Sequence, residues 1–206
     1  MGRCLEPYFK AVFCLKMGYF DTDIQAYFIV SAKSLYAGVP SYVYLVLAII
    51  SLLSLISFLF FDIKKYWQAW IKILVVEYIL LIYCSTVLFR VCNDGQGYTF
   101  TPFWSYWAIC EGNGNLLAEN IMNVVVFVPL GFLLGLSSKS VTLRQAFLTG
   151  LCISLSIELL QFFFNRGFAE FDDIFHNTLG CSIGFLIVAV IKGLLLPNHN
   201  DNHNLI

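Results

Sequence analysis

The sequence predicts an all-α integral membrane protein in which about five transmembrane helices form a bundle. Of the 206 residues, 59% are hydrophobic and only 12% are charged, and the mean hydropathy is +0.78. A soluble domain carries about 25% charged and about 45–50% apolar residues. The apolar residues also lie in runs of about 20, the length that a helix needs to cross a bilayer. These runs must be helical, because an open strand cannot satisfy its backbone hydrogen bonds in lipid.

The chain divides into three parts. Residues 1–40 carry apolar side chains at helical spacing, interrupted by lysines, which favours one or two amphipathic helices at the membrane interface. A poorly ordered leader is the alternative for this segment. Residues 41–196 hold the predicted bundle, and residues 197–206 form a polar tail.

Five apolar runs predict the membrane-spanning helices. In chain order they are Tyr42–Phe61, Ile71–Phe89, Leu117–Leu136, Gln145–Phe164 and Ile174–Leu195. Lysine and arginine lie in the short loops 62–70 and 137–144 and at the end of the last span, and such residues concentrate on the cytoplasmic side. We therefore expect a cytoplasmic C-terminus in a bacterial inner membrane, with segments 90–116 and 165–173 outside. The basic residues of the N-terminal segment do not fit this orientation unless that segment holds a further span.

Charge and cysteine usage restrict the class of partner. The formal net charge is −1, and no basic arm or basic–aromatic patch is present, so we expect no nucleic-acid partner. Of the seven cysteines, Cys92 and Cys110 fall in the same predicted external loop, where a disulfide bridge is possible but not required.

Polar side chains inside the apolar runs are the candidates for function, because ionisable groups within a bilayer are costly. Glu158 lies roughly 9 Å inside the predicted outer end of its helix, at about 1.5 Å per residue, and Asn123 lies at a similar depth in the preceding span. Neighbouring polar residues share helix faces at i, i+3 or i, i+4 spacing. The candidate binding residues, all near the predicted outer end, are Arg90, Glu119, Asn123, Glu158, Gln161, Arg166, Asp172, Asp173 and Asn177.

These residues predict a polar pocket that opens outward. Glu158 and Asp173 are the candidate acid/base groups should the site be catalytic. The alternative is structural, because Asn, Gln and Glu between membrane helices often serve as interhelical hydrogen bonds. His176 follows Asp172 by four residues, but two potential ligands are a weak signal, and we expect no metal and no cofactor.

Three segments resemble the VanZ-like family of bacterial membrane proteins. Asn123-Val-Val-Val-Phe-Val-Pro-Leu-Gly131 resembles the family's N-x-x-x-F-x-P-L-G segment. Ile157-Glu-Leu-Leu-Gln161, then Asp172-Asp173 and Asn177-Thr-Leu-Gly180, resembles its E-x-x-Q … D-D-x-x-x-N-T-x-G pattern. Arg90 and Pro102-Phe103 also fall at matching places. The resemblance covers about residues 80–190, and the family is named for a protein that raises resistance to the glycopeptide teicoplanin.

The resemblance implies positions rather than a reaction, so three hypotheses stay open. The chain binds or modifies a membrane lipid, wall precursor or glycopeptide at the outer pocket, with a contribution to teicoplanin resistance. Alternatively, it is a membrane enzyme that acts on a lipid-linked envelope substrate by carboxylate acid/base chemistry. In the third hypothesis it is a structural subunit of a membrane complex.

Overall fold

The structure is a computed structural model that describes residues 29–30, 33, 38–60, 63–90 and 97–195. Most of the predicted N-terminal segment and the whole polar tail lie outside the described residues. Cys92 lies outside them as well, so the Cys92–Cys110 bridge remains a prediction. The description below concerns the predicted bundle and the segments that connect its helices.

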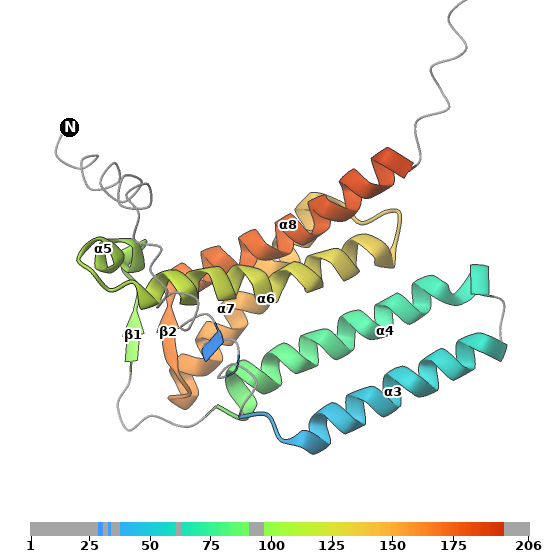
Figure 1. Ribbon diagram of the computed structural model, residues 1–206, viewed down its shortest axis with the longest axis horizontal. Helices are drawn as coiled ribbons and strands as arrows, with labels where there is room; N and C mark the ends of the chain where they lie inside the picture. Colours follow the sequence, from blue (N-terminus) through green and yellow to red (C-terminus); the bar gives the residue numbers. More distant parts are fainter. Residues whose placement is uncertain (1–28, 31–32, 34–37, 61–62, 91–96, 196–206) are drawn as a thin grey trace, which may run out of the picture.

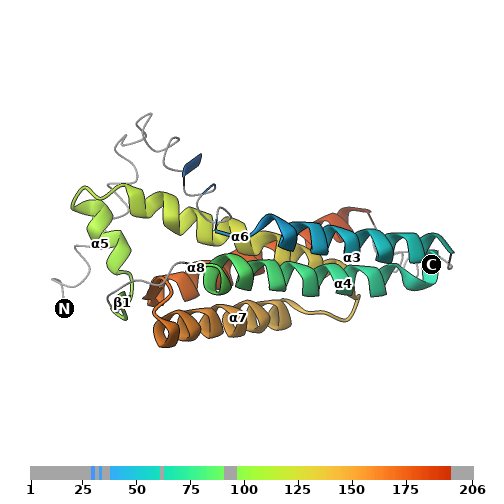
Figure 2. The ribbon, with the colours of Figure 1, turned by 90° about the horizontal axis from the view of Figure 1, so that it is seen from below.

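Among the described residues, five long apolar helices make up most of the structure and run along its long axis (Figures 1 and 2). They are α3 (Ser41–Phe60), α4 (Ile63–Tyr83), α6 (Asn115–Ser137), α7 (Leu143–Phe164) and α8 (Phe171–Leu195). Four of them are long and apolar enough to cross a membrane, and α3 contributes a shorter apolar run. The predicted all-α membrane bundle is confirmed, and the chain is a multi-pass membrane protein.

The helix boundaries agree with the sequence prediction except at the start of α4. This helix begins at Ile63, so most of the segment that we predicted as a loop, 62–70, is helical. The prediction was wrong because lysine ends an apolar run without ending a helix, since its helix propensity is high. At its other end α4 continues into a π-helical segment, η1 (Cys84–Leu88).

Three short elements gather at one end of the bundle, which we call the α5 end (Figure 1). They are strand β1 (Gly97–Thr99), helix α5 (Trp104–Cys110) and strand β2 (Phe168–Glu170). The two strands pair in parallel, with Tyr98 opposite Ala169 and Thr99 opposite Glu170. The sequence did not predict these elements, because three to seven residues are too few to establish a helical or strand period.

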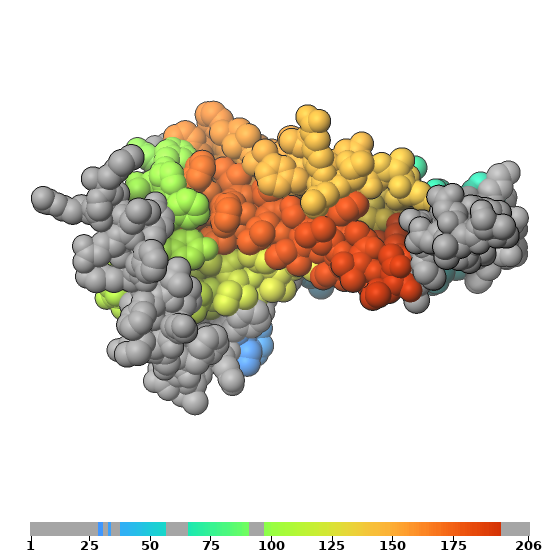
Figure 3. Space-filling view, turned by 90° about the horizontal axis from the view of Figure 1, so that it is seen from above, coloured from blue at the N-terminus to red at the C-terminus, as the bar shows by residue number. Residues whose placement is uncertain are grey.

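Glycines bring the backbones of α6 and α8 into direct contact. A Cβ atom at Gly180 would overlap the carbonyl of Val124, and one at Gly184 would overlap the carbonyl of Val128. Gly180 and Gly184 form a G-x-x-x-G pair, the spacing that lets membrane helices approach closely. In the space-filling view α8 lies between α7 and α6 (Figure 3). The α6–α8 pair is therefore the centre of the fold, on which the other helices pack.

An apolar core lies beside this pair, where α4, α6 and α7 meet. Ile82, Phe127, Leu130 and Ile157 are each at most 2% exposed and belong to one hydrophobic cluster. Helix α3 lies outside the core and contacts α4, where Ser51 Oγ donates a hydrogen bond to Glu77 Oε2. The polar side chains of the candidate site therefore lie between this apolar core and the α5 end.

Candidate functional site

Glu158 of α7 is the innermost carboxylate of the site. It lies six residues before the end of the helix, and its side chain is only 5% exposed. Its Oε2 atom accepts a hydrogen bond of 2.9 Å from the backbone N–H of Glu170, which holds strand β2 against the helix. The other oxygen of this carboxyl group receives no hydrogen bond from the described residues. Glu158 therefore both fixes β2 and keeps one oxygen for another partner.

Asn123 and Asp173 join α6 to α8 beside this carboxylate. Asn123 Nδ2 donates a hydrogen bond of 2.6 Å to Asp173 Oδ1, and both side chains are partly buried. Asp173 also interacts electrostatically with Glu158, which brings the candidates of three helices into one place. The structure therefore brings Asn123, Glu158 and Asp173 close together, and their role as a binding site stays a prediction.

Arg90 supplies a positive charge at the edge of the site. The residue lies two positions after the end of η1, and its side chain is exposed. It interacts electrostatically with the carboxyl groups of Glu158, Glu170 and Asp173. Gly167 has a φ of +99°, and a Cβ atom there would lie 2.8 Å from Cζ of Arg90. The turn therefore needs glycine twice, for its backbone conformation and for the space that the guanidinium group occupies.

Glu170 of β2 is a site residue that the sequence analysis did not select. Its Oε2 atom accepts a hydrogen bond of 3.0 Å from the Trp104 indole N–H of α5. Burial raises the pKa of this carboxyl group to about 7, and the negative charges of Glu119 and Asp172 act in the same direction. The Trp104 hydrogen bond and the charge of Arg90 oppose the rise of this pKa. Glu170 can therefore take up and release a proton near neutral pH.

Asp172, the other half of the Asp-Asp pair, is committed to helix α5. It is fully buried, and its Oδ2 atom accepts hydrogen bonds from the Ser105 backbone N–H at 3.1 Å and the Ser105 hydroxyl at 2.6 Å. Its Oδ1 atom accepts a third hydrogen bond from the Phe103 backbone N–H. Asn120 Nδ2 donates to the same Ser105 hydroxyl at 3.0 Å. The carboxylate thus caps the start of α5 and fastens it to α8.

Three further candidates hold neighbouring segments together. Gln161 Nε2 donates to the carbonyl of Thr86 at 3.0 Å, and Asn177 Nδ2 donates to Ser154 Oγ at 2.8 Å. Arg166 donates to the carbonyl of Val87 at 3.2 Å and also to that of Leu88. Gln161 and Arg166 therefore attach the end of α7 and the turn that follows it to η1. These hydrogen bonds are of the interhelical kind that the structural alternative anticipated.

The side chains that converge at the α5 end form what we call the acidic site. It consists of Arg90, Asn123, Glu158, Glu170 and Asp173, with the exposed Glu119 close enough to influence Glu170 and Asp173 electrostatically. The carboxyl groups come from α6, α7, β2 and α8, and the positive charge of Arg90 opposes theirs. Such a site favours a ligand that carries a positive charge and hydrogen-bond donors.

A metal site is not formed around His176. Its Nε2 atom forms a hydrogen bond of 2.7 Å with the Tyr106 hydroxyl, and Asp172 is occupied by α5. Within the described ranges, no three side chains of His, Cys, Asp and Glu are grouped so that they could hold a metal ion.

Comparison with known proteins places this arrangement in a family. A model of the VanZ/LLP1 family matches residues 43–192, which run from the first turn of α3 to the last turn of α8 and include the acidic site. The chain belongs to the VanZ/LLP1 family. It is also 36% identical over 66 residues to Protein VanZ of Enterococcus faecium, a match that covers 32% of this chain and 41% of that relative. No solved structure matches the chain.

The VanZ-like motif residues divide into two groups in this structure. Asn123, Glu158 and Asp173 lie in the acidic site, whereas Gln161 and Asn177 bind neighbouring segments. Sequence reasoning missed Glu170 because a carboxylate in a polar turn is unremarkable. Its backbone bond to Glu158 depends on the path of the turn, although Gly167 three residues earlier indicated an unusual backbone there.

Proposed function

We propose that the chain binds a cell-envelope component, such as a lipid, a wall precursor or a glycopeptide, at the acidic site, and that binding contributes to teicoplanin resistance. The observation that carries the proposal is the convergence of Glu158, Asp173, Glu170 and Arg90 from four separate segments. Structural hydrogen bonding alone does not require several ionisable groups at one end of the bundle. In this proposal the α5 end faces the outside of a bacterial inner membrane and the C-terminus lies in the cytoplasm.

The resistance part of the proposal rests on family membership. The motifs that carry the resemblance are those of a family named for teicoplanin resistance, and the chain spans 41% of the length of its Enterococcus faecium relative. The site part rests on the geometry of this chain. The two parts are tested together in cells that lack the native copy of the protein.

The experiment compares wild type with Glu158→Gln at equal membrane abundance. Glutamine preserves an oxygen that accepts the hydrogen bond from the Glu170 N–H, so the variant removes the negative charge and leaves the fold of β2. Teicoplanin susceptibility and the profile of lipid-linked envelope precursors are measured in both strains. We expect Glu158→Gln to reduce a wild-type effect. The matched control is Glu111→Gln, the same chemical change at an exposed carboxylate outside the acidic site. If the Glu158→Gln strain has the same teicoplanin susceptibility and precursor profile as wild type, the function does not depend on the carboxylate of Glu158.

A second candidate function is catalysis on a lipid-linked envelope substrate. Glu170 favours it, because a carboxyl group with a pKa of about 7 is suited to general acid/base chemistry at neutral pH. Glu158 touches the backbone of the same residue, so two carboxylates lie within one site. If the chain is an enzyme, Glu170→Gln abolishes formation of a modified precursor in the lipid extract while ligand retention persists. If both Gln variants retain the same precursor profile as wild type, carboxylate catalysis is excluded.

A further inference from the structure

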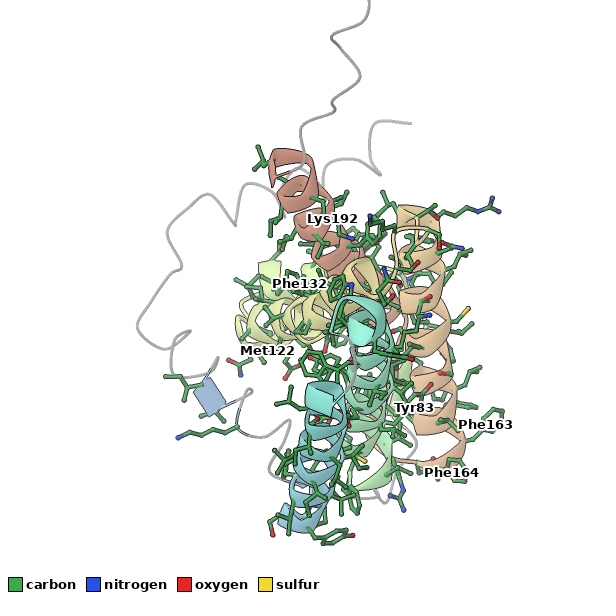
Figure 4. The ribbon with its side chains drawn as sticks, turned by 90° about the vertical axis from the view of Figure 1, so that its right-hand side faces the viewer. Tyr83, Met122, Phe132, Phe163, Phe164 and Lys192 are labelled. Carbon is green, nitrogen blue, oxygen red and sulfur yellow. The ribbon has the colours of Figure 1, made fainter. Side chains whose placement is uncertain are left out.

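An exposed aromatic cluster lies at the α5 end, formed by Tyr98, Phe100 and Phe162. The rings of Tyr98 and Phe100 are stacked with their centroids 5.2 Å apart, and Phe162 of α7 contacts both at 5.5 and 6.0 Å. Tyr98 is 50% exposed and Phe100 is 58% exposed. The next two residues of α7, Phe163 and Phe164, project away from the bundle (Figure 4). Aromatic side chains of this kind favour the head-group layer of a bilayer.

The aromatic cluster and the acidic site are neighbours. Tyr98 belongs to β1, which pairs with β2 so that Thr99 lies opposite Glu170. Paired strands lie about 4.8 Å apart and successive side chains point to opposite faces, so Tyr98 shares a face with Ala169, and Glu170 lies on the other face of the neighbouring strand. Phe162 follows Glu158 by four residues, which places both on one face of α7, one helical turn apart. Phe162 therefore connects the aromatic cluster to the acidic site, and a molecule of the bilayer that lies on the cluster is one helical turn from Glu158.

The charges at this end specify the polar end of such a molecule. A cation favours the ionised forms of the carboxyl groups of Glu119, Glu158, Glu170 and Asp173 and is attracted by them, whereas a bare anion is repelled. Arg90 carries a positive charge at the edge of the site, and its side chain is exposed, so its guanidinium group can bind a phosphate.

Gln161 gives an independent indication of a ligand with donors. Its side chain is 4% exposed, on the same helix face as Glu158, and its Oε1 atom is buried without a partner among the described residues. A buried carbonyl oxygen without a hydrogen bond is costly, and the N–H groups of an ammonium ion could supply one.

We propose that the molecule bound at the acidic site is a phospholipid whose head group carries both a phosphate and a primary ammonium group. The ammonium group lies among the carboxylates, the phosphate lies at Arg90, and the apolar chains lie on Tyr98, Phe100 and Phe162. The lipid enters sideways from the leaflet around the α5 end. This inference rests on the acidic site being the binding site of the proposed function.

Trp104 provides a reporter at the site, since its indole N–H bonds Glu170. A variant that retains Trp104 alone is made with Trp67→Phe, Trp70→Phe and Trp107→Phe. It is placed in phosphatidylcholine vesicles that contain increasing amounts of a lipid with brominated chains, which quench indole fluorescence on contact. The brominated lipid has an ethanolamine, a choline or a glycerol head group, so that the arms differ only in the head.

We expect half-maximal quenching at a mole fraction about five- to tenfold lower for the ethanolamine lipid than for the glycerol lipid. That ratio corresponds to about 1–1.4 kcal/mol, the net contribution of one typical hydrogen bond. The choline lipid keeps the charge but has no N–H donors, so it should lie between them. Glu158→Gln with Glu170→Gln should remove the preference, and Arg90→Gln should weaken quenching by all three lipids, because each carries the phosphate. Equal quenching by the three lipids would overturn the proposal.

A second measurement uses the wild-type chain and does not depend on the triple Trp variant folding. Lipids that copurify with the wild type are quantified by mass spectrometry and compared with the bulk membrane. Enrichment of ammonium phospholipids that is lost in Glu170→Gln supports the proposal, and the absence of enrichment contradicts it.

The two proposals can fail separately. If the quenching assay shows a head-group preference but the Glu158→Gln strain has wild-type teicoplanin susceptibility, the lipid is bound and the proposed function is wrong. The reverse result means that the acidic site acts on a different ligand.

Discussion

Replacing Asp172 with alanine should release helix α5 from the bundle and leave the long helices in place. The carboxylate of Asp172 accepts hydrogen bonds from the backbone N–H groups of Phe103 and Ser105 and from the Ser105 hydroxyl. Alanine leaves these three donors in a fully buried place without an acceptor. The structure therefore predicts that α5 separates from the bundle more often, and the change in its opening free energy depends on the cost of the lost hydrogen bonds.

The magnitude follows from the type of hydrogen bond. A hydrogen bond to a charged group contributes about 1.5–3 kcal/mol, so three of them amount to about 4–9 kcal/mol if α5 stayed docked. The seven-residue helix can instead separate and expose the same donors to water, which limits the cost to the free energy of docking α5. We expect the opening free energy of this segment to fall by at least about 1.4 kcal/mol, which is a tenfold loss of protection from hydrogen exchange.

Hydrogen–deuterium exchange of the protein in nanodiscs measures this directly. The peptide that covers α5 should exchange at least about tenfold faster in Asp172→Ala, with peptides of α6 and α8 nearly unchanged. Asp173→Asn is the matched control, because this neighbouring residue bonds Asn123 and does not touch α5. If α5 exchanges equally fast in Asp172→Ala and wild type, the docking of α5 does not depend on Asp172. The Asp172 carboxylate would then be available to bind a ligand.

Three more predictions concern packing and protonation. Gly184→Ala should lower stability by about 1–3 kcal/mol in a thermal melt, because the new Cβ overlaps the Val128 carbonyl, whereas Gly193→Ala, with nothing within 4 Å, should melt as wild type. Tyr83→Phe should cost about 0.5–1.5 kcal/mol by the same measurement, since it removes the hydroxyl that bonds Ser156; an unchanged melt would show that water replaces this bond. Because the folded protein raises the pKa of Glu170 from 4.5 to about 7, stability should fall as the pH rises between these values and level off above them, and Glu170→Gln should flatten the profile; a parallel profile in wild type and variant would contradict this sign.

The sequence was sufficient for the five long helices, because a bilayer demands runs of about 20 apolar residues and such runs are visible directly. It also indicated Asn123 and Glu158, since a polar side chain inside an apolar run is conspicuous, and it placed Asp173 at the rim of the same predicted pocket. The same signal could not separate Asp172 from Asp173. Consecutive residues of a helix point about 100° apart, so one faces α5 and the other faces Asn123, and that choice depends on how α8 is rotated against its neighbours.

Other features depend on tertiary contacts that carry no local pattern. Glu170 joins the acidic site because the turn after α7 folds back and its backbone N–H bonds Glu158. Strands β1 and β2 are three residues long and pair across about 70 positions of the chain. The start of α4 was misplaced because hydropathy reports where a helix leaves lipid and not where its backbone hydrogen bonds begin.

The contact between α6 and α8 has a consequence for how the protein is made. Helix α6 leaves the ribosome well before α8, and until α8 arrives the face with Gly131 and Gly135 meets lipid tails instead of a helix backbone. Lipid tails cannot follow the shallow surface of a glycine face as closely as another helix does. The arrival of α8 therefore completes both the centre of the bundle and the acidic site, through Asp173. A chain that ends before α8 would be inserted in the membrane but left without its central helix pair, and it would be a substrate for membrane quality-control proteases.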